Sequence, residues 1–150
     1  MHRMADDREQ SIAFDLDDES NGTQRFFSLC YPILGALDDG DFIVIDELDC
    51  SMHPRLTRKI VQLFLSEEYN QNGAQLVFIS HDSSLLDSKL LRRDQIWLTQ
   101  KRESGETDFY SLSDIESRPR KNEAIERRYL EGRYGAVPNF GPEFDSLYVE

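Results

Sequence analysis

The sequence predicts an α/β fold with a parallel sheet at its centre and helices on its flanks. Residues 42–45 and 75–79 are continuous apolar runs of strand-forming residues, which are typical of strands covered on both faces. Between them, Pro54 and apolar residues at helical spacing predict a helix that ends near Asn72-Gly73. Strand, helix and strand then form one right-handed βαβ unit, so the two strands should lie parallel.

Further elements are predicted on either side of this unit. Residues 12–16 alternate apolar and polar, as in a short half-buried strand. Ser20 and Asn21 can cap a helix whose apolar residues continue to Leu37, and Pro32 should kink or shorten it. After the second apolar strand we expect a helix at 83–91, a hairpin of strands at 95–99 and 109–112, and a helix at 122–130 that ends before Gly132.

Composition bounds the class of protein. The 150 residues are 39% apolar and 31% charged, which is enough for a folded domain with a core. A net charge of −12 disfavours a nucleic-acid groove, although a basic cluster at 118–133 is either a solvated helix face or a polyanion contact. No apolar run approaches the roughly 20 residues that span a bilayer, and no secretory signal opens the chain. We therefore expect a cytoplasmic protein, with Cys30 and Cys50 as reduced thiols.

Two consecutive carboxylates, Asp46 and Glu47, follow the first apolar strand. Open α/β sheets bind their ligands at the carboxyl ends of strands. One carboxylate can hold Mg²⁺, a cation that prefers oxygen ligands, and the other can orient or deprotonate a water molecule. This arrangement is typical of the Walker B motif of nucleotide hydrolases. The alternative is a pair of acids in an exposed turn.

His81 follows the second apolar strand. If the two strands are parallel neighbours, His81 should lie at the same sheet edge as Glu47. An imidazole at that edge can donate a hydrogen bond to a terminal phosphate. The alternative is a histidine that only caps or packs.

Ser20, Asn21 and Gly22 stand where a helix is predicted to begin. Backbone N–H groups and the helix dipole favour an anion at such a position, and Gly22 permits close approach of a phosphate. The alternative is an ordinary N-cap.

In their order and spacing, these three segments resemble the ABC-type ATPases, specifically the soluble branch that includes chromosome-maintenance, break-repair and phage-defence proteins. Residues 19–25 are similar to the signature motif, Asp46-Glu47 to the end of the Walker B strand, 48–54 to the D-loop, and His81 to the switch histidine. Residues 51–56 and 128–138 are similar to AAA-type ATP-binding proteins of the abortive-infection kind. The resemblance covers residues 18–138. It implies the C-terminal part of a P-loop NTPase head, with a small hairpin and helix extension.

The sequence departs from this family in one important respect. The P-loop pattern GxxxxGK[ST] is missing: Gly35 and Gly40 have its glycine spacing, but Asp41 and Phe42 follow where Lys and Ser or Thr are needed. Asn21 also replaces the usual Ser or Gly of the signature. We therefore expect a C-terminal half, from a truncated gene, an expressed fragment or a split protein, that is inactive alone.

The resemblance implies a role for each candidate residue. Asp46 would hold Mg²⁺, Glu47 would polarise the attacking water, and His81 would sense the γ-phosphate of ATP. Ser20 and Gly22 would reach the ATP of a partner head. Two D-loop residues, Asp49 and His53, would lie at the dimer seam. The implied partners are a Walker A-bearing N-terminal half or a second head, in a homodimer of heads, and a nuclease or nucleic-acid effector, with no membrane.

Two other functional classes remain open from the sequence. A metal-dependent nuclease could use a carboxylate–histidine cluster made of Asp46, Glu47, Asp49, His53, His81 and Asp82. A catalytically idle regulatory fragment would only dock to another chain. Under the ATPase interpretation we divide the chain into a flexible N-terminus (1–11), an ATPase lobe (12–115), and a C-terminal helix and tail (116–150).

Overall fold

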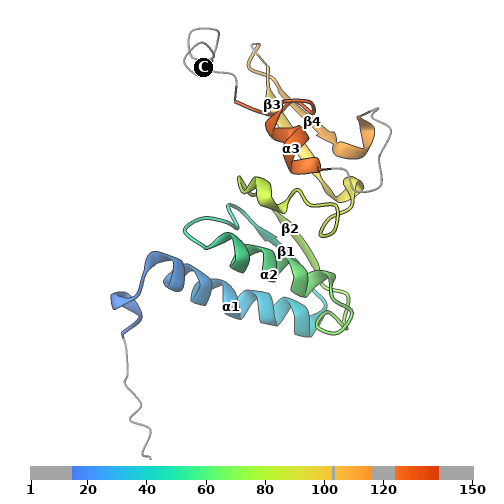
Figure 1. Cartoon of the computed structure of the whole chain (residues 1–150). Coiled ribbons are helices and arrows are strands. Elements are labelled where there is room, and N and C mark those ends of the chain that lie inside the picture. The colour runs from blue at the N-terminus through green and yellow to red at the C-terminus, as the bar shows by residue number, and fades with distance from the viewer. Residues whose placement is uncertain (1–14, 103, 116–123, 139–150) are drawn as a thin grey trace, which may run out of the picture. The chain divides into compact units, whose positions relative to one another are not determined.

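The computed structural model describes residues 15–102, 104–115 and 124–138. They divide into two compact units, Met1–Ile79 and Ser80–Glu150. This division falls after the second apolar strand, and the boundaries expected from the sequence, after residues 11 and 115, stay predictions. The first unit contains α1 (Asn21–Asp39), β1 (Phe42–Ile45), α2 (Pro54–Leu65) and β2 (Gln75–Phe78), and the second contains β3 (Trp97–Lys101), β4 (Thr107–Ser111) and α3 (Ile125–Leu130), as labelled in Figure 1.

The first unit is built on a parallel pair of strands, as the sequence predicted. Strand β1 (Phe42–Ile45) pairs with β2 (Gln75–Phe78), and the register runs from Phe42 opposite Gln75 to Ile45 opposite Phe78. Helix α2 (Pro54–Leu65) connects them, with Pro54 in its first turn. Helix α1 (Asn21–Asp39) precedes β1 and begins at Ser20, its N-cap. The α/β character of the fold is therefore confirmed.

Coverage of both faces of the strands is not confirmed. Residues of β1 and β2 alternate between the two faces, and on one face Phe42 and Val44 are 62% and 60% exposed, with Val77 and Ile79 exposed beside them. The opposite face contributes Ile45 to a core that α1 and α2 complete with Leu29, Ile33, Leu37, Ile60 and Val61. The described sheet therefore has one apolar face that no described helix covers.

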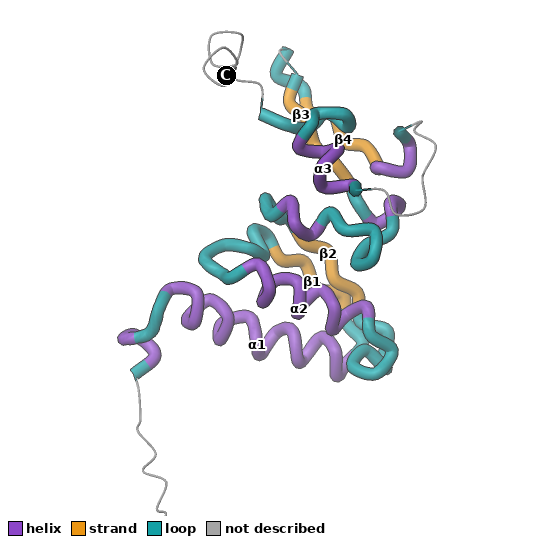
Figure 2. The backbone as a smooth tube through the Cα atoms, in the orientation of Figure 1, coloured by secondary structure: helices purple, strands orange, loops and turns teal. Residues whose placement is uncertain are grey.

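Pro32 does not shorten α1, which continues to Asp39 and is uninterrupted in Figure 2. Proline removes one backbone hydrogen bond, but Pro32 is exposed, so the carbonyl group it leaves unpaired can turn to water. The buried neighbours Leu29 and Ile33 keep both halves of the helix packed on the core.

Two other helix predictions were wrong in their extent. Helix α2 ends at Leu65 rather than near Asn72-Gly73, because the amide of Asn70 donates to the carbonyl groups of Phe64 and Ala74 and folds the chain into a loop. Residues 83–91 form a 3-10 turn at Ser83–Leu85 followed by a turn at 88–90. Aspartate side chains at 82 and 87 accept backbone N–H groups two residues ahead, which competes with helix formation.

The second unit contains the predicted hairpin, with its strands moved by about two residues. Strand β3 (Trp97–Lys101) pairs antiparallel with β4 (Thr107–Ser111). The preceding residues, Arg93–Gln95, form a 3-10 turn that delays the start of β3. Helix α3 (Ile125–Leu130) packs with this hairpin in one core made of Ile96, Leu98, Leu112, Ile125 and Tyr134.

The remaining predictions fall partly outside the described residues. The strand expected at 12–16 is replaced at Leu16 by a 3-10 turn, Leu16–Asp18, and its other residues up to 14 are not described. The flexible N-terminus, residues 118–123 of the basic cluster and most of the tail also lie outside the described residues. Among the described helices, none has both the length and the apolar character needed to cross a membrane.

Candidate functional site

The two candidate carboxylates lie on a turn at the carboxyl end of β1. Asp46 and Glu47 are exposed, whereas the next side chain, Leu48, is fully buried. The backbone N–H of Leu48 donates to the carbonyl oxygen of Ile79 at 2.9 Å, and the N–H of Ile79 donates to Ile45 at 3.0 Å. The buried leucine and these bonds anchor the turn to β2, so both carboxylates project from the carboxyl edge of the parallel pair.

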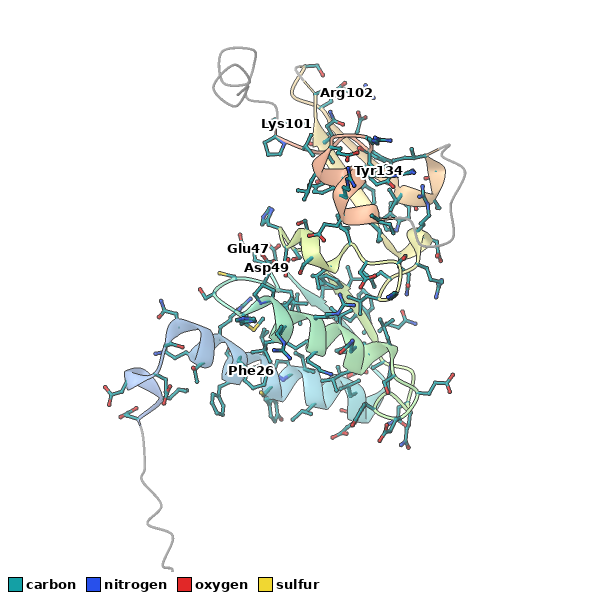
Figure 3. All side chains as sticks on the ribbon, viewed as in Figure 1. Phe26, Glu47, Asp49, Lys101, Arg102 and Tyr134 are labelled. Atoms are coloured by element: carbon teal, nitrogen blue, oxygen red, sulfur yellow. The ribbon has the colours of Figure 1, made fainter. Side chains whose placement is uncertain are left out.

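The backbone of this turn adopts two unusual conformations. Glu47 and Ser51 have φ values of 49° and 60°, in the left-handed region that non-glycine residues seldom enter. Each such residue costs on the order of 1–3 kcal/mol and persists only where its surroundings hold it. Hydrogen bonds from Cys50 N–H to Glu47 and from Met52 N–H to Asp49 supply part of that restraint. Figure 3 shows Glu47 and Asp49 on this turn.

The N-terminus of α1 is capped as the sequence predicted. The Ser20 hydroxyl oxygen accepts the N–H of Thr23 at 3.2 Å and lies 2.9 Å from the Thr23 hydroxyl. The Gln24 amide donates to the Glu19 carbonyl oxygen at 3.0 Å. A helix of 19 residues has a positive dipole end here, which favours an anion. Ser20 therefore has the capping role of the alternative interpretation and stands at a helix end suited to a phosphate.

The first turns of α1 pack directly against the turn after β1. A Cβ atom built on Gly22 would collide with the Ser51 carbonyl oxygen, so only glycine fits there. Three residues further along, the Arg25 guanidinium donates from Nη2 to the Asp46 carbonyl oxygen at 3.3 Å. The structure thus brings the predicted signature segment against the segment that carries Asp46, Glu47 and Asp49.

A cavity of about 420 Å³ lies between these two segments. One cation, Arg25, contributes to its lining. The lining residues are Asn21, Gln24, Arg25, Ser28, Cys50 and Ser51. The sequence alone assigned no role to Arg25, although it is the one basic residue of α1 and lies in the second turn of that helix.

The D-loop candidates have different surroundings. His53 is the N-cap of α2, and its Nδ1 atom accepts the N–H of Arg55 at 3.1 Å. This contact gives His53 a structural role in starting α2. Asp49 is half-buried on the turn after β1. The placement of both residues at a dimer seam stays a prediction.

His81 belongs to the second unit, two residues beyond Ile79, and its side chain is exposed. Ile79 itself bonds to the backbone of β1 and of the turn. The parallel pairing that motivated the assignment is confirmed, and a contact of His81 with the Asp46–Glu47 edge stays a prediction.

The described residues contain no group of three or more His, Cys, Asp or Glu side chains that could hold a metal ion. The structure therefore offers no ligand cluster to the metal-dependent nuclease alternative. A single exposed carboxylate such as Asp46 still suits Mg²⁺, which usually keeps several waters and takes other ligands from the substrate's phosphates.

Part of the chain matches a known protein family. A family model described as "AAA domain, putative AbiEii toxin, Type IV TA system" matches residues 3–87, which is more than half of the chain. The matched range includes α1, the turn after β1, α2 and His81. No curated protein and no solved structure matches the chain.

Proposed function

Because this chain belongs to the AAA domain family described as putative AbiEii toxin of a type IV toxin–antitoxin system, we propose that it is the C-terminal half of an ABC-type ATPase head. The family is ATPase-like, with an α/β P-loop NTPase fold. In the proposed head, ATP and Mg²⁺ bind at an interface between two heads, and hydrolysis switches an effector. That effector would act in a toxin or phage-defence system.

One observation carries this proposal: Asp46 and Glu47 leave the carboxyl end of a parallel strand on a turn that packs against a capped helix N-terminus. Asp46 would hold Mg²⁺ through water, and Glu47 would draw a proton from the attacking water. His81 would contact the γ-phosphate. Positioning and charge stabilisation of this kind account for most of the catalysis of phosphoryl transfer.

The other elements complete an interface between two heads. Ser20 and Gly22, at the N-terminus of α1, would contact ATP held by the partner head, and Asp49 and His53 would lie along the seam. Mg²⁺ supplies the positive charge that offsets charge on the phosphates. A Walker A-bearing segment, on an N-terminal half or another chain, supplies the phosphate cradle that this sequence does not contain.

The first experiment tests the need for that segment. Without P-loop amides and lysine the β- and γ-phosphates lose most of their contacts. Titration calorimetry of the chain alone with Mg-ATP should detect no binding tighter than about 1 mM, or roughly −4 kcal/mol. Micromolar binding by the chain alone would contradict the proposal. Binding and turnover that appear only after addition of a Walker A-bearing half would separate an ATPase half from an idle regulatory fragment.

The second experiment separates the two carboxylates in the completed head. Glu47→Gln should lower the hydrolysis rate by about 10²–10⁴-fold while ATP binding survives, because a general base is lost. Asp46→Asn should weaken Mg-ATP binding itself, because a metal ligand is lost. Asp41→Asn is the matched control, since Asp41 is exposed at the opposite end of β1. Hydrolysis at the parental rate by Glu47→Gln would show that Glu47 is not the base.

A further inference from the structure

The peptide group between Asp46 and Glu47 is held by a side chain that the roles above leave unused. Arg25 on α1 donates to the Asp46 carbonyl oxygen at 3.3 Å. That oxygen belongs to the same planar peptide as the N–H of Glu47. The hydrogen bond therefore restrains the plane from which the φ angle of Glu47 is measured.

Glu47 needs such a restraint because its φ is 49°. A non-glycine residue in this region is less stable by roughly 1–2 kcal/mol than in an ordinary conformation. Rotation of the Asp46–Glu47 peptide would let Glu47 return to a negative φ, and its exposed carboxylate would then point elsewhere. The neighbouring bond of Leu48 to Ile79 anchors the far side of Glu47 but not the near side.

Arg25 is also costly to keep at this position. Its Nε atom is buried and has no hydrogen-bond partner among the described residues. An unsatisfied buried donor costs about 1–3 kcal/mol, and more when charged. A residue with only a packing role could be apolar, so a charged residue with a buried, unpaired Nε atom indicates a role that needs the guanidinium.

We propose that Arg25 is a positioning residue, which holds the Asp46–Glu47 peptide so that the Glu47 carboxylate faces the attacking water. The same hydrogen bond couples the orientation of that carboxylate to the position of the N-terminus of α1. The orientation of Glu47 towards water rests on the proposed function, whereas the restraint of the Asp46–Glu47 peptide by Arg25 does not. Gly22 against Ser51 is a second tie between the same two segments. If α1 shifts when its N-terminus contacts a phosphate, Glu47 would therefore move with it. The helix end that contacts one nucleotide would then change the position of the carboxylate that acts at the other nucleotide.

The backbone part is tested on the chain as it stands. The three-bond coupling between the amide and Hα protons of Glu47, measured by NMR, depends on φ. Arg25→Gln should change this coupling and the amide shifts of residues 46–48, while the amide signals in the second half of α1 stay in place. Ser28→Ala is the matched control, since Ser28 lines the same cavity and its hydroxyl donates within α1, to the Arg25 carbonyl oxygen, rather than to the turn after β1. An unchanged Glu47 coupling in folded Arg25→Gln would overturn the proposal.

The catalytic part is tested in the head completed with a Walker A-bearing half. Arg25→Gln should lower kcat by about 10–100-fold with KM for Mg-ATP nearly unchanged, because a misplaced group loses rate rather than binding. Arg25→Lys should recover only part of that loss, since an ammonium lacks the planar fork. Millimolar guanidinium ion, which the open cavity can admit, should raise the rate of Arg25→Ala above that in equal NaCl.

A double-mutant cycle decides whether Arg25 acts through Glu47. In a Glu47→Gln background, adding Arg25→Gln should change kcat by less than about threefold, since residues that share one function are not additive. Full additivity would overturn the proposal. If the completed parental head shows no hydrolysis that depends on Glu47, the proposed function is wrong. The NMR result still shows in that case whether Arg25 restrains the backbone of the turn.

Discussion

The two units of this chain differ in how each one arranges its buried and exposed apolar residues. In the second unit, β3, β4, α3 and the segment after it enclose one core, in which Leu112 and Ile125 are almost fully buried. In the first unit, the outer face of β1 and β2 is open. The second unit also leaves large apolar side chains exposed, since Trp97 and Phe109 of the hairpin are 53% and 66% exposed and their rings stack on each other. The first unit differs in that its open apolar face belongs to the strand pair that leads into Asp46 and Glu47.

Helix α1 also has an exposed apolar side. Leu29, Ile33 and Leu37 face the core, yet Phe27 and Tyr31 lie on the opposite side and are 56% and 88% exposed. A helix that is apolar on all sides is usually buried on all sides. In the proposed head, both the exposed side of α1 and the exposed face of the strand pair would be available for contact with another segment.

The largest expected effect tests whether the second unit is a separate folding unit. Leu112→Ala should lower its free energy of unfolding by about 2–5 kcal/mol, because a buried side chain leaves a cavity. Trp97 is the single tryptophan and lies in β3, so its fluorescence reports this unit in a urea titration. Leu130→Ala, at an exposed position, is the control. If far-UV circular dichroism of the helices shifts by the same amount as Trp97 fluorescence, the two units unfold together.

A smaller effect is expected at the contact between α1 and the turn after β1. Gly22→Ala should destabilise the first unit by about 1–3 kcal/mol, because an added Cβ forces the Ser51 carbonyl away. Gly35→Ala on the same helix meets no atom within 4 Å and should stabilise it by about 0.5–1 kcal/mol. Thermal unfolding followed by circular dichroism should give shifts of opposite sign. Equal shifts would remove the evidence for a close contact at Gly22.

The open face of the strand pair should promote self-association of the chain. Val44 and Val77 lie directly opposite each other on that face. The double variant Val44→Lys with Val77→Glu keeps a favourable cross-strand pair and should weaken association about tenfold, or about 1.4 kcal/mol. Sedimentation velocity at several concentrations measures this, with Leu130→Lys of the second unit as control. A parental chain that is monomeric throughout would contradict the prediction.

The smallest expected effect concerns a tyrosine hydrogen bond within the second unit. The Tyr110 hydroxyl donates to the Tyr134 carbonyl oxygen at 2.7 Å. Burial, followed by the nearby charges of Asp108 and Tyr129, raises the pKa of Tyr110. The unfolded chain then loses this proton first, so the stabilisation is complete below about pH 10 and is lost as the pH rises through the raised pKa.

Tyr110→Phe should therefore cost about 1 kcal/mol at neutral pH and should reduce the loss of stability in alkali. Urea titrations of Trp97 fluorescence at pH 8 and pH 11 measure both quantities. Tyr69→Phe, an exposed tyrosine of the first unit, is the control. If Tyr110→Phe and the parent lose the same free energy of unfolding at alkaline pH, the pH dependence comes from other groups.

The sequence by itself determined the features that depend on nearest neighbours along the chain. The Ser20 cap, Pro54 in the first turn of α2, the two apolar strands and the hairpin all follow from local preferences, and the structure contains each of them. The carboxylates after β1 followed from the same local pattern. Errors arose where side chains such as Asn70 and Asp82 bond to the backbone and end a helical turn early.

Only the tertiary structure decided the features that depend on residues far apart in the sequence. Burial of Leu29 and Ile33 carries α1 past Pro32, and packing of α1 against the turn requires glycine at position 22. The bond of Arg25 to Asp46 and the left-handed backbone of Glu47 also require the two segments to be folded together. Local sequence preferences predict neither this bond nor this backbone conformation. The free energy that stabilises both comes from contacts between segments about 20 residues apart in the chain.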